Sequence, residues 1–162
     1  MNLVNTNPPV SGDSPTRRVP ETFRARSLFV SLTVSDLQKS LHWYMNVAGF
    51  TLIEKFEHDG RLAAANLVAG AVRIRLNQDN GARDLDRARG RGMSLQFTTA
   101  QNVDEIARRI QAHGGTLDTE PADMPWGVRL FSVLDPDGFV LVIVSDPDVE
   151  RSRWQIAREQ QG

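Results

Sequence analysis

The chain has 162 residues and a mass of 18.1 kDa, the size of one compact domain, which excludes a large second domain. Its composition, 40% hydrophobic and 24% charged residues, is that of an ordinary globular protein. A net charge of −1 offers no electrostatic reason to expect nucleic acid as a partner. Because cysteine is absent, disulfides, thiolate metal sites and cysteine nucleophiles are excluded.

Three histidines, His42, His58 and His113, are left for metal or general-base chemistry. Their positions, on a predicted helix, in a predicted turn and before two glycines, favour structural roles. The apolar run Phe139–Val144 is far shorter than the ~20 residues of a membrane helix. Residues 1–25 lack the apolar segment of a secretion signal, so we predict a cytoplasmic protein.

The first half of the chain predicts one strand, one helix and three further strands. Residues 1–25, rich in Asn, Pro, Ser and Thr, predict a disordered arm. Apolar residues then alternate over Leu28–Val34, as in a half-buried strand. Ser35 or Asp36 can cap the helix that follows, and Gly49 ends it. Strands are predicted over 51–57, 61–68 and 71–76, with a hairpin turn at 58–60.

The second half repeats this order after residues 78–91, a charged stretch that predicts a mobile surface connector. An offset of 65 residues places the Gly-Gly-Thr-Leu that begins at Gly114 beside the Gly-Phe-Thr-Leu that begins at Gly49. We therefore predict an α+β fold of two β-α-β-β-β modules. The predicted strands of the second half are 93–98, 116–120, 128–134 and 139–144, the last buried on both faces; its helix is 103–110 and its tight turn 135–138.

These elements define the predicted domain organisation. A single domain, residues 26–147, contains module one (27–77) and module two (92–146). A polar helix or tail over 148–162 follows it.

Two segments resemble the vicinal oxygen chelate superfamily, which groups glyoxalase I, bleomycin-resistance proteins and extradiol dioxygenases. Residues 34–50 are similar to its first strand-to-helix passage, and residues 126–138 to its final hairpin. The resemblance implies two four-stranded sheets that form a curled, mixed-sheet cup, with helices outside and a ligand inside. Because a partner subunit often completes such a cup in this superfamily, it also implies a homodimer.

The enzymes of this superfamily hold a divalent metal with one His, Gln or Glu from each of four strands. Carried over position by position, these ligands fall on Phe29, Arg75, Ser94 or Met93, and Val142. None of these side chains is a ligand of such a metal, and Arg75 would repel a cation. We therefore expect neither the superfamily's metal nor another cofactor.

Strand alternation predicts which residues would line the cup, since side chains opposite the helix-facing apolar set point inward. The resulting surface mixes apolar groups, hydroxyl or amide groups, and guanidinium groups, which suits an organic ligand with an anionic group or a planar ring. Alternatively, Arg73 and Arg75 pair with carboxylates or reach solvent. The predicted ligand-binding residues are Phe29, Ser31, Thr33, Arg73, Arg75, Ser94, Gln96, Trp126 at the rim, and Val142.

Three function classes follow. The first is a metal-free binding protein, similar to bleomycin-resistance proteins, for a small organic molecule that can be anionic. The alternative is a divergent glyoxalase- or dioxygenase-type lyase or oxidoreductase, either with another metal-ligand set or independent of metal. A third is a regulatory, partner-binding module without a ligand. Neither nucleic acid nor membrane is expected as a partner.

Overall fold

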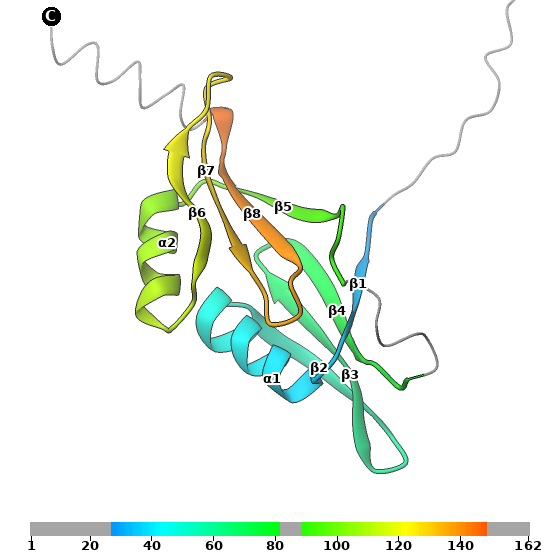
Figure 1. Cartoon of the computed structure of the whole chain (residues 1–162). Coiled ribbons are helices and arrows are strands. Elements are labelled where there is room, and N and C mark those ends of the chain that lie inside the picture. The colour runs from blue at the N-terminus through cyan, green and yellow to red at the C-terminus, as the bar shows by residue number, and fades with distance from the viewer. Residues whose placement is uncertain (1–26, 82–88, 149–162) are drawn as a thin grey trace, which may run out of the picture.

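The computed structural model describes residues 27–81 and 89–148, which form two four-stranded sheets and two helical segments (Figure 1). Sheet A has the strand order β1-β4-β3-β2, and sheet B has the order β5-β8-β7-β6. The predicted arm, the middle of the predicted connector and nearly all of the predicted tail lie outside the described residues.

Module one contributes sheet A and the first helical segment. Strand β1 is parallel to β4, whereas β2, β3 and β4 are joined by antiparallel pairing. The elements are β1 (Val30–Val34), α1 (Leu37–His42), the π-helical segment η1 (Trp43–Ala48), β2 (Thr51–His58), β3 (Arg61–Ala69) and β4 (Val72–Gln78).

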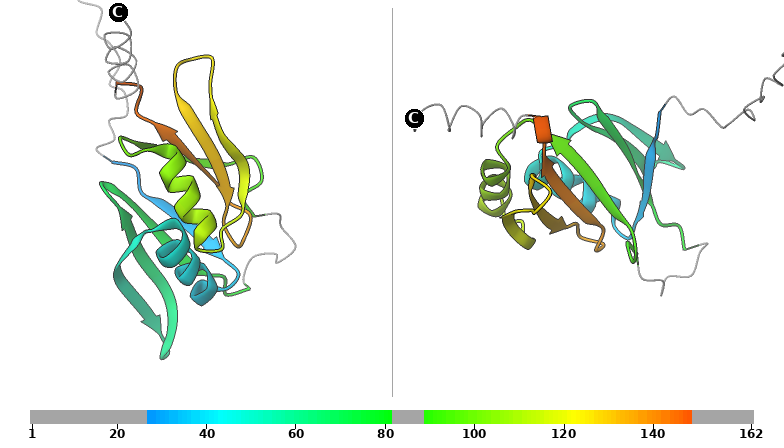
Figure 2. Two further views of the ribbon diagram at one scale, coloured as in Figure 1. Left: turned by 90° about the vertical axis from the view of Figure 1, so that its left-hand side faces the viewer. Right: turned by 90° about the horizontal axis from the view of Figure 1, so that it is seen from above.

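Module two repeats the same order and the same pairing in sheet B. The elements are β5 (Ser94–Thr99), α2 (Val103–Ala112), β6 (Leu117–Asp123), β7 (Arg129–Leu134) and β8 (Val140–Ser145). The last backbone hydrogen bond of the parallel pair recurs in both modules. The Val34 carbonyl accepts from the Asp79 amide, and the Thr99 carbonyl accepts from the Asp146 amide; the two acceptors are 65 residues apart and the two donors 67. The predicted α+β fold of two repeated modules is confirmed, and the sheets do not close into a barrel (Figure 2).

Helix α1 begins where its capping residue predicts. The Asp36 side chain accepts a hydrogen bond from the Lys39 amide at 3.0 Å, which satisfies one of the free amides of the first turn. The helix then widens into η1 and ends at Gly49, whose φ of 85° is left-handed and suits glycine. The prediction did not anticipate the change to π-helical geometry inside this element.

The cores of the two modules form a single apolar cluster rather than two. Tyr44, fully buried, packs edge to face against Phe50, and Phe50 does the same against Phe97 of β5. The helical segments α2 and η1 also touch, and Figure 2 (left) shows α1 and α2 side by side. The helix-facing sides of both sheets therefore face this shared interior, which leaves the opposite sides available for other roles.

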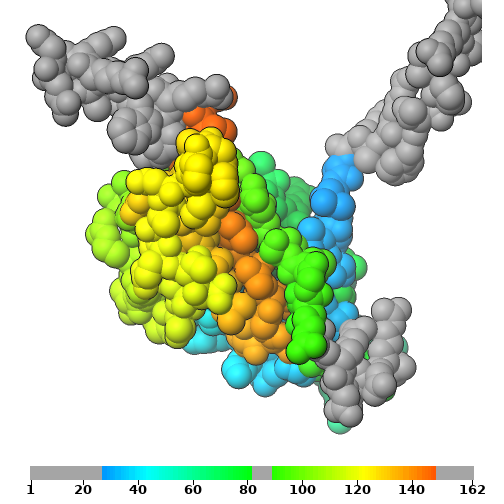
Figure 3. Space-filling model, turned by 45° about the horizontal axis from the view of Figure 1, so that its top comes forward, coloured from blue at the N-terminus to red at the C-terminus, as the bar shows by residue number. Residues whose placement is uncertain are grey.

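Strand β8 departs from its prediction. Leu141 and Ile143 are buried as expected, and so is Val144, but Val140 and Val142 are half-buried, so the first part of this strand is not covered on both faces. Figure 3 shows β8 at the surface between β6 and β7 on one side and the residues leading into β5 on the other. The continuous apolar run misled the prediction, because a valine on an open sheet face has the same sequence signal as a buried one.

Candidate ligand-binding faces

The side of sheet A opposite its buried side, which we call the A face, carries rows of register-matched residues. The central row runs from Ser31 through Arg75 and Asn66 to Glu54. Their neighbours one position along each strand, such as Leu76 and Ala65, are buried in the core. Rows on either side contain Thr33, Asn77, Ala64 and Phe56, and Arg73 and Val68.

Arg75 is the most ordered cation of the A face. Its Nε donates to Asn66 Oδ1 at 2.9 Å. Its guanidinium carbon lies 4.6 Å from the ring centroid of Phe56 and 5.8 Å from that of Phe29, within the range of cation–π attraction. Asn66 in turn donates to Glu54 Oε2 at 3.4 Å. Two aromatic rings and one neutral amide thus hold the guanidinium in one orientation.

Neither arginine of the A face is neutralised by a carboxylate in the described part of the chain. Arg75 makes no ion pair there, and the exposed side chain of Arg73 has no hydrogen-bond or ion-pair partner among those residues. The Asn77 side-chain amide donates to Ser31 Oγ at 2.7 Å, so this amide bonds to a neutral group of the same face. Within the described residues these arginines therefore do not pair with carboxylates, which was one part of the alternative interpretation. The other part, that they reach solvent, holds for Arg73.

The corresponding side of sheet B, which we call the B face, has no charged side chain in its register-matched rows. Its middle row joins Gln96, Val142, Ser132 and Thr119. A bulge in β6 brings both Thr119 and Asp118 to the Ser132 hydroxyl, at 2.8 Å each. The rows beside it are Ser94, Val140 and Leu134, and Thr98, Val144, Leu130 and Ala122.

The predicted lining set is divided between these two faces. Phe29, just before β1, contacts Arg75 of sheet A. The other members on sheet A are Ser31, Thr33 and Arg73, and those on sheet B are Ser94, Gln96 and Val142. No hydrogen bond, ion pair or ring contact within the described residues joins a member of one group to a member of the other.

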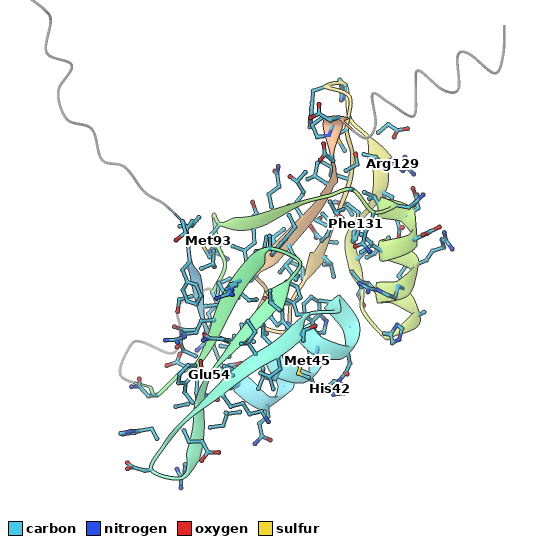
Figure 4. The ribbon with its side chains drawn as sticks, turned by 180° about the vertical axis from the view of Figure 1, so that it is seen from behind. His42, Met45, Glu54, Met93, Arg129 and Phe131 are labelled. Carbon is cyan, nitrogen blue, oxygen red and sulfur yellow. The ribbon has the colours of Figure 1, made fainter. Side chains whose placement is uncertain are left out.

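Trp126 lies apart from both groups. It is 70% exposed, in the hairpin between β6 and β7. Figure 4 shows Glu54 on sheet A and Phe131, a core residue, on sheet B.

The four positions that the resemblance assigns to the superfamily's metal ligands carry side chains that are poor metal donors. Phe29 is 48% exposed, Met93 is 46% exposed, and Arg75 and Val142 are half-buried. Within residues 27–81 and 89–148, no group of three or more His, Cys, Asp or Glu side chains lies close enough together to hold a metal ion. The side chains present at these positions do not fit a divalent cation.

A buried polar cluster joins the two modules. The Asp137 carboxylate, in the β7–β8 turn, accepts from the Ser35 amide at 3.0 Å and lies 3.5 Å from Arg89, which also pairs with Asp79. The side chains of these three charged residues are 4 to 13% exposed. Arg89 belongs to the stretch predicted as a mobile surface connector, and that prediction is wrong at this residue because its guanidinium is buried between two carboxylates.

The same turn supplies a second buried carboxylate, Asp135. It accepts from the Phe139 amide at 2.8 Å, from the Asp137 amide at 2.9 Å and from the Tyr44 hydroxyl at 2.9 Å. Burial raises the pKa of Asp135, and burial together with this carboxylate raises the pKa of Tyr44. The predicted hairpin turn is confirmed, and its Asp135 also links η1 to sheet B through Tyr44.

Three residues of the A face, Asn66, Phe56 and Glu54, escaped the sequence prediction. Asn66 carried a usable signal, since it is a polar residue between the apolar Ala65 and Leu67 in a strand of alternating burial. A bulge between Leu52 and Glu54 hid the other two, because it changes which residues of β2 share a face.

Comparison with known proteins confirms the resemblance. The sequence model of the Glyoxalase/Bleomycin resistance protein/Dioxygenase superfamily matches residues 26–143, most of the chain. The chain belongs to this superfamily. Among the helices of the described part, none is long and apolar enough to cross a membrane.

The named relatives of this chain share about 30% of its sequence or less. The chain is 30% identical over 131 residues to a probable lactoylglutathione lyase of Vibrio cholerae, covering 75% of this chain and 91% of that one. It is 28% identical over 127 residues to a lactoylglutathione lyase of Neisseria meningitidis, covering 74% and 89%. Among solved structures, a superfamily member from Sphaerobacter thermophilus matches with a TM-score of 0.63 at 25% identity, covering 76% of this chain and 98% of that one.

Proposed function

We propose that this superfamily member binds a small organic anion on the A face, without the metal used by the superfamily's enzymes. The observation that carries the proposal is the state of Arg75. It is half-buried and lacks a carboxylate partner among the described residues, and the resemblance assigns its position to a metal ligand in the superfamily's enzymes. A cation in that state favours an anionic ligand, since charge-assisted hydrogen bonds are the strong ones.

The partner that would complete the site is a second copy of the chain, giving a homodimer in the cytoplasm. Both sheet faces are open, and β1 and β5 are edge strands. Large exposed apolar side chains occur on both faces or at their edges, namely Leu28, Phe29, Met93 and Leu134. A dimer that sets the B face of one copy opposite the A face of the other would cover them and bring the two groups of the predicted lining set together.

Native mass spectrometry of the freshly purified full-length protein tests the metal-free binder and the dimer together. We expect a dimer mass, no stoichiometric metal, and any co-purified ligand to be absent from Arg75→Gln but present in Arg61→Gln. Arg61 is an exposed arginine at the β2–β3 turn and serves as the matched control. Stoichiometric nickel, zinc or iron retained by the protein would overturn the metal-free proposal, and a monomer mass would overturn the dimer.

A second candidate is a divergent lyase, favoured by the sequence identity to proteins named lactoylglutathione lyase. Because the four ligand positions hold no donor for a divalent cation, we place this candidate second. An assay for lactoylglutathione formation with added nickel or zinc separates the two. Metal-stimulated turnover would favour the enzyme, whereas no turnover with intact ligand binding would favour the binder.

A further inference from the structure

We infer that the A face selects a planar aromatic monocarboxylate, a ligand class narrower than the organic anion proposed above. This inference rests on the proposed function, since it requires that the A face binds a ligand. It comes from the shape, charge and free hydrogen-bonding groups around Arg75.

The hydrogen-bonding capacity that remains on Arg75 is directional. Its Nε is occupied by Asn66, while neither Nη atom bonds to any residue of the described part. The free end of the guanidinium therefore presents two parallel donors. A carboxylate is the planar group that matches such a pair, with one oxygen for each donor.

The surroundings of the guanidinium are aromatic. The ring centroids of Phe56 and Phe29 lie 4.6 Å and 5.8 Å from its central carbon, and Phe29 is 48% exposed. A ligand whose carboxylate lies at the end of the guanidinium would place its adjoining atoms against this exposed ring. A planar ring makes offset or edge contacts there that a saturated ring of the same size lacks.

The charge of the face favours a single negative charge on the ligand. Its central rows contain two cations, Arg73 and Arg75, and one anion, Glu54. A monoanion balances this set, whereas a doubly charged phosphate would face Glu54 with excess charge. Glu54 also has an oxygen without a partner among the described residues, which would accept from a hydroxyl or amino group on the ring.

Ligand-observed NMR titrations of the full-length protein with benzoate, cyclohexanecarboxylate and inorganic phosphate at millimolar concentrations test the inference. We expect benzoate to bind at least about threefold more tightly than cyclohexanecarboxylate, and phosphate to bind most weakly. Arg75→Gln should weaken benzoate binding by about tenfold or more, since a charge-assisted pair is lost. Arg61→Gln should leave it unchanged.

Phe56→Leu separates the aromatic preference from anion binding. The leucine keeps an apolar side chain but removes the ring, so the ratio of benzoate to cyclohexanecarboxylate affinity should fall toward one while cyclohexanecarboxylate still binds. The affinity ratio does not depend on the fraction of folded protein, because both acids are measured on the same sample.

The titrations distinguish a failure of the aromatic monocarboxylate inference from a failure of the proposed function. If both acids bind equally, or phosphate binds more tightly, in a manner that depends on Arg75, the aromatic monocarboxylate inference is overturned and the proposed function stands. If none of the three anions binds, or Arg75→Gln binds as the unmodified chain does, the inference and anion binding on the A face both fail.

Discussion

The two modules have the same topology and the same buried side, yet their open faces differ in charge. The A face carries Arg73, Arg75 and Glu54 in its central rows, and the B face rows carry no charged side chain. The buried side must remain apolar in both copies, because each packs into one common core. The open side is free of that constraint, so the repeat can specialise there, with two arginines on the A face and none in the B face rows, where the nearest charge is the Asp118 carboxylate bonded to Ser132.

Core positions that match in register should contribute alike to stability. Ile74 of β4 pairs with Val30 of β1 as Leu141 of β8 pairs with Leu95 of β5, and both Ile74 and Leu141 are almost fully buried. Ile74→Ala and Leu141→Ala should each lower the free energy of unfolding by about 2–5 kcal/mol, because each leaves a cavity in the shared core. Urea denaturation checks this. A large loss in one variant and almost none in the other would show that the two modules do not share one cooperative core.

The junction between the modules is asymmetric and should be sensitive on one side. Asp137→Ala removes the acceptor of the Ser35 amide and one partner of buried Arg89, so we expect a loss of about 2–4 kcal/mol in the free energy of unfolding. Asp59→Asn, at the exposed turn of module one, is the control and should change stability little, because asparagine tolerates the left-handed φ of 50° at this residue. Equal effects of the two substitutions in urea denaturation would contradict a stabilising role for the buried polar cluster around Asp137.

The titration of buried Asp135 should be visible in the pH dependence of the free energy of unfolding. The pKa of Asp135 is raised in the folded protein. The stability that protonated Asp135 contributes is therefore fully present below the unfolded pKa and is lost as pH rises through the folded pKa. Asp135→Asn keeps an acceptor for the Phe139 and Asp137 amides and removes the buried charge. The unmodified protein should therefore lose stability relative to Asp135→Asn as pH rises from 4 toward 7, measured by urea denaturation at each pH. A constant difference would rule out this titration.

The smallest effect is expected at the surface of module two. Arg129 pairs with Asp104 at 2.8 Å and Asp123 at 3.0 Å, and this arginine lowers the pKa of the Asp104 carboxyl. The stabilisation is present above the unfolded pKa and is lost as pH falls through the lowered folded pKa. Because Asp104 is 42% exposed, Asp104→Asn should cost at most about 1 kcal/mol at pH 7, and less in high salt. A larger cost that resists salt would indicate a buried role.

Much of the fold was predictable because the strands of each sheet alternate in polarity. Leu32 and Ile74 mark the buried side of sheet A by alternation alone, and Gly49 and Gly114 mark equivalent ends of the helical segments. The site was only partly predictable. Arg75 and Phe29 follow from strand alternation, whereas Phe56 lies beyond a bulge and its contact with Arg75 crosses β3.

The sequence by itself determined the two-module order and the repeated order of elements, because each depends on local pattern. Tertiary structure decided which side chains meet. It placed Arg75 beside two aromatic rings, buried Arg89 between Asp79 and Asp137, and put the charged and neutral halves of the predicted lining set on separate faces. Such contacts depend on register, bulges and the packing of one module against the other, which residues distant in the chain create only when it folds.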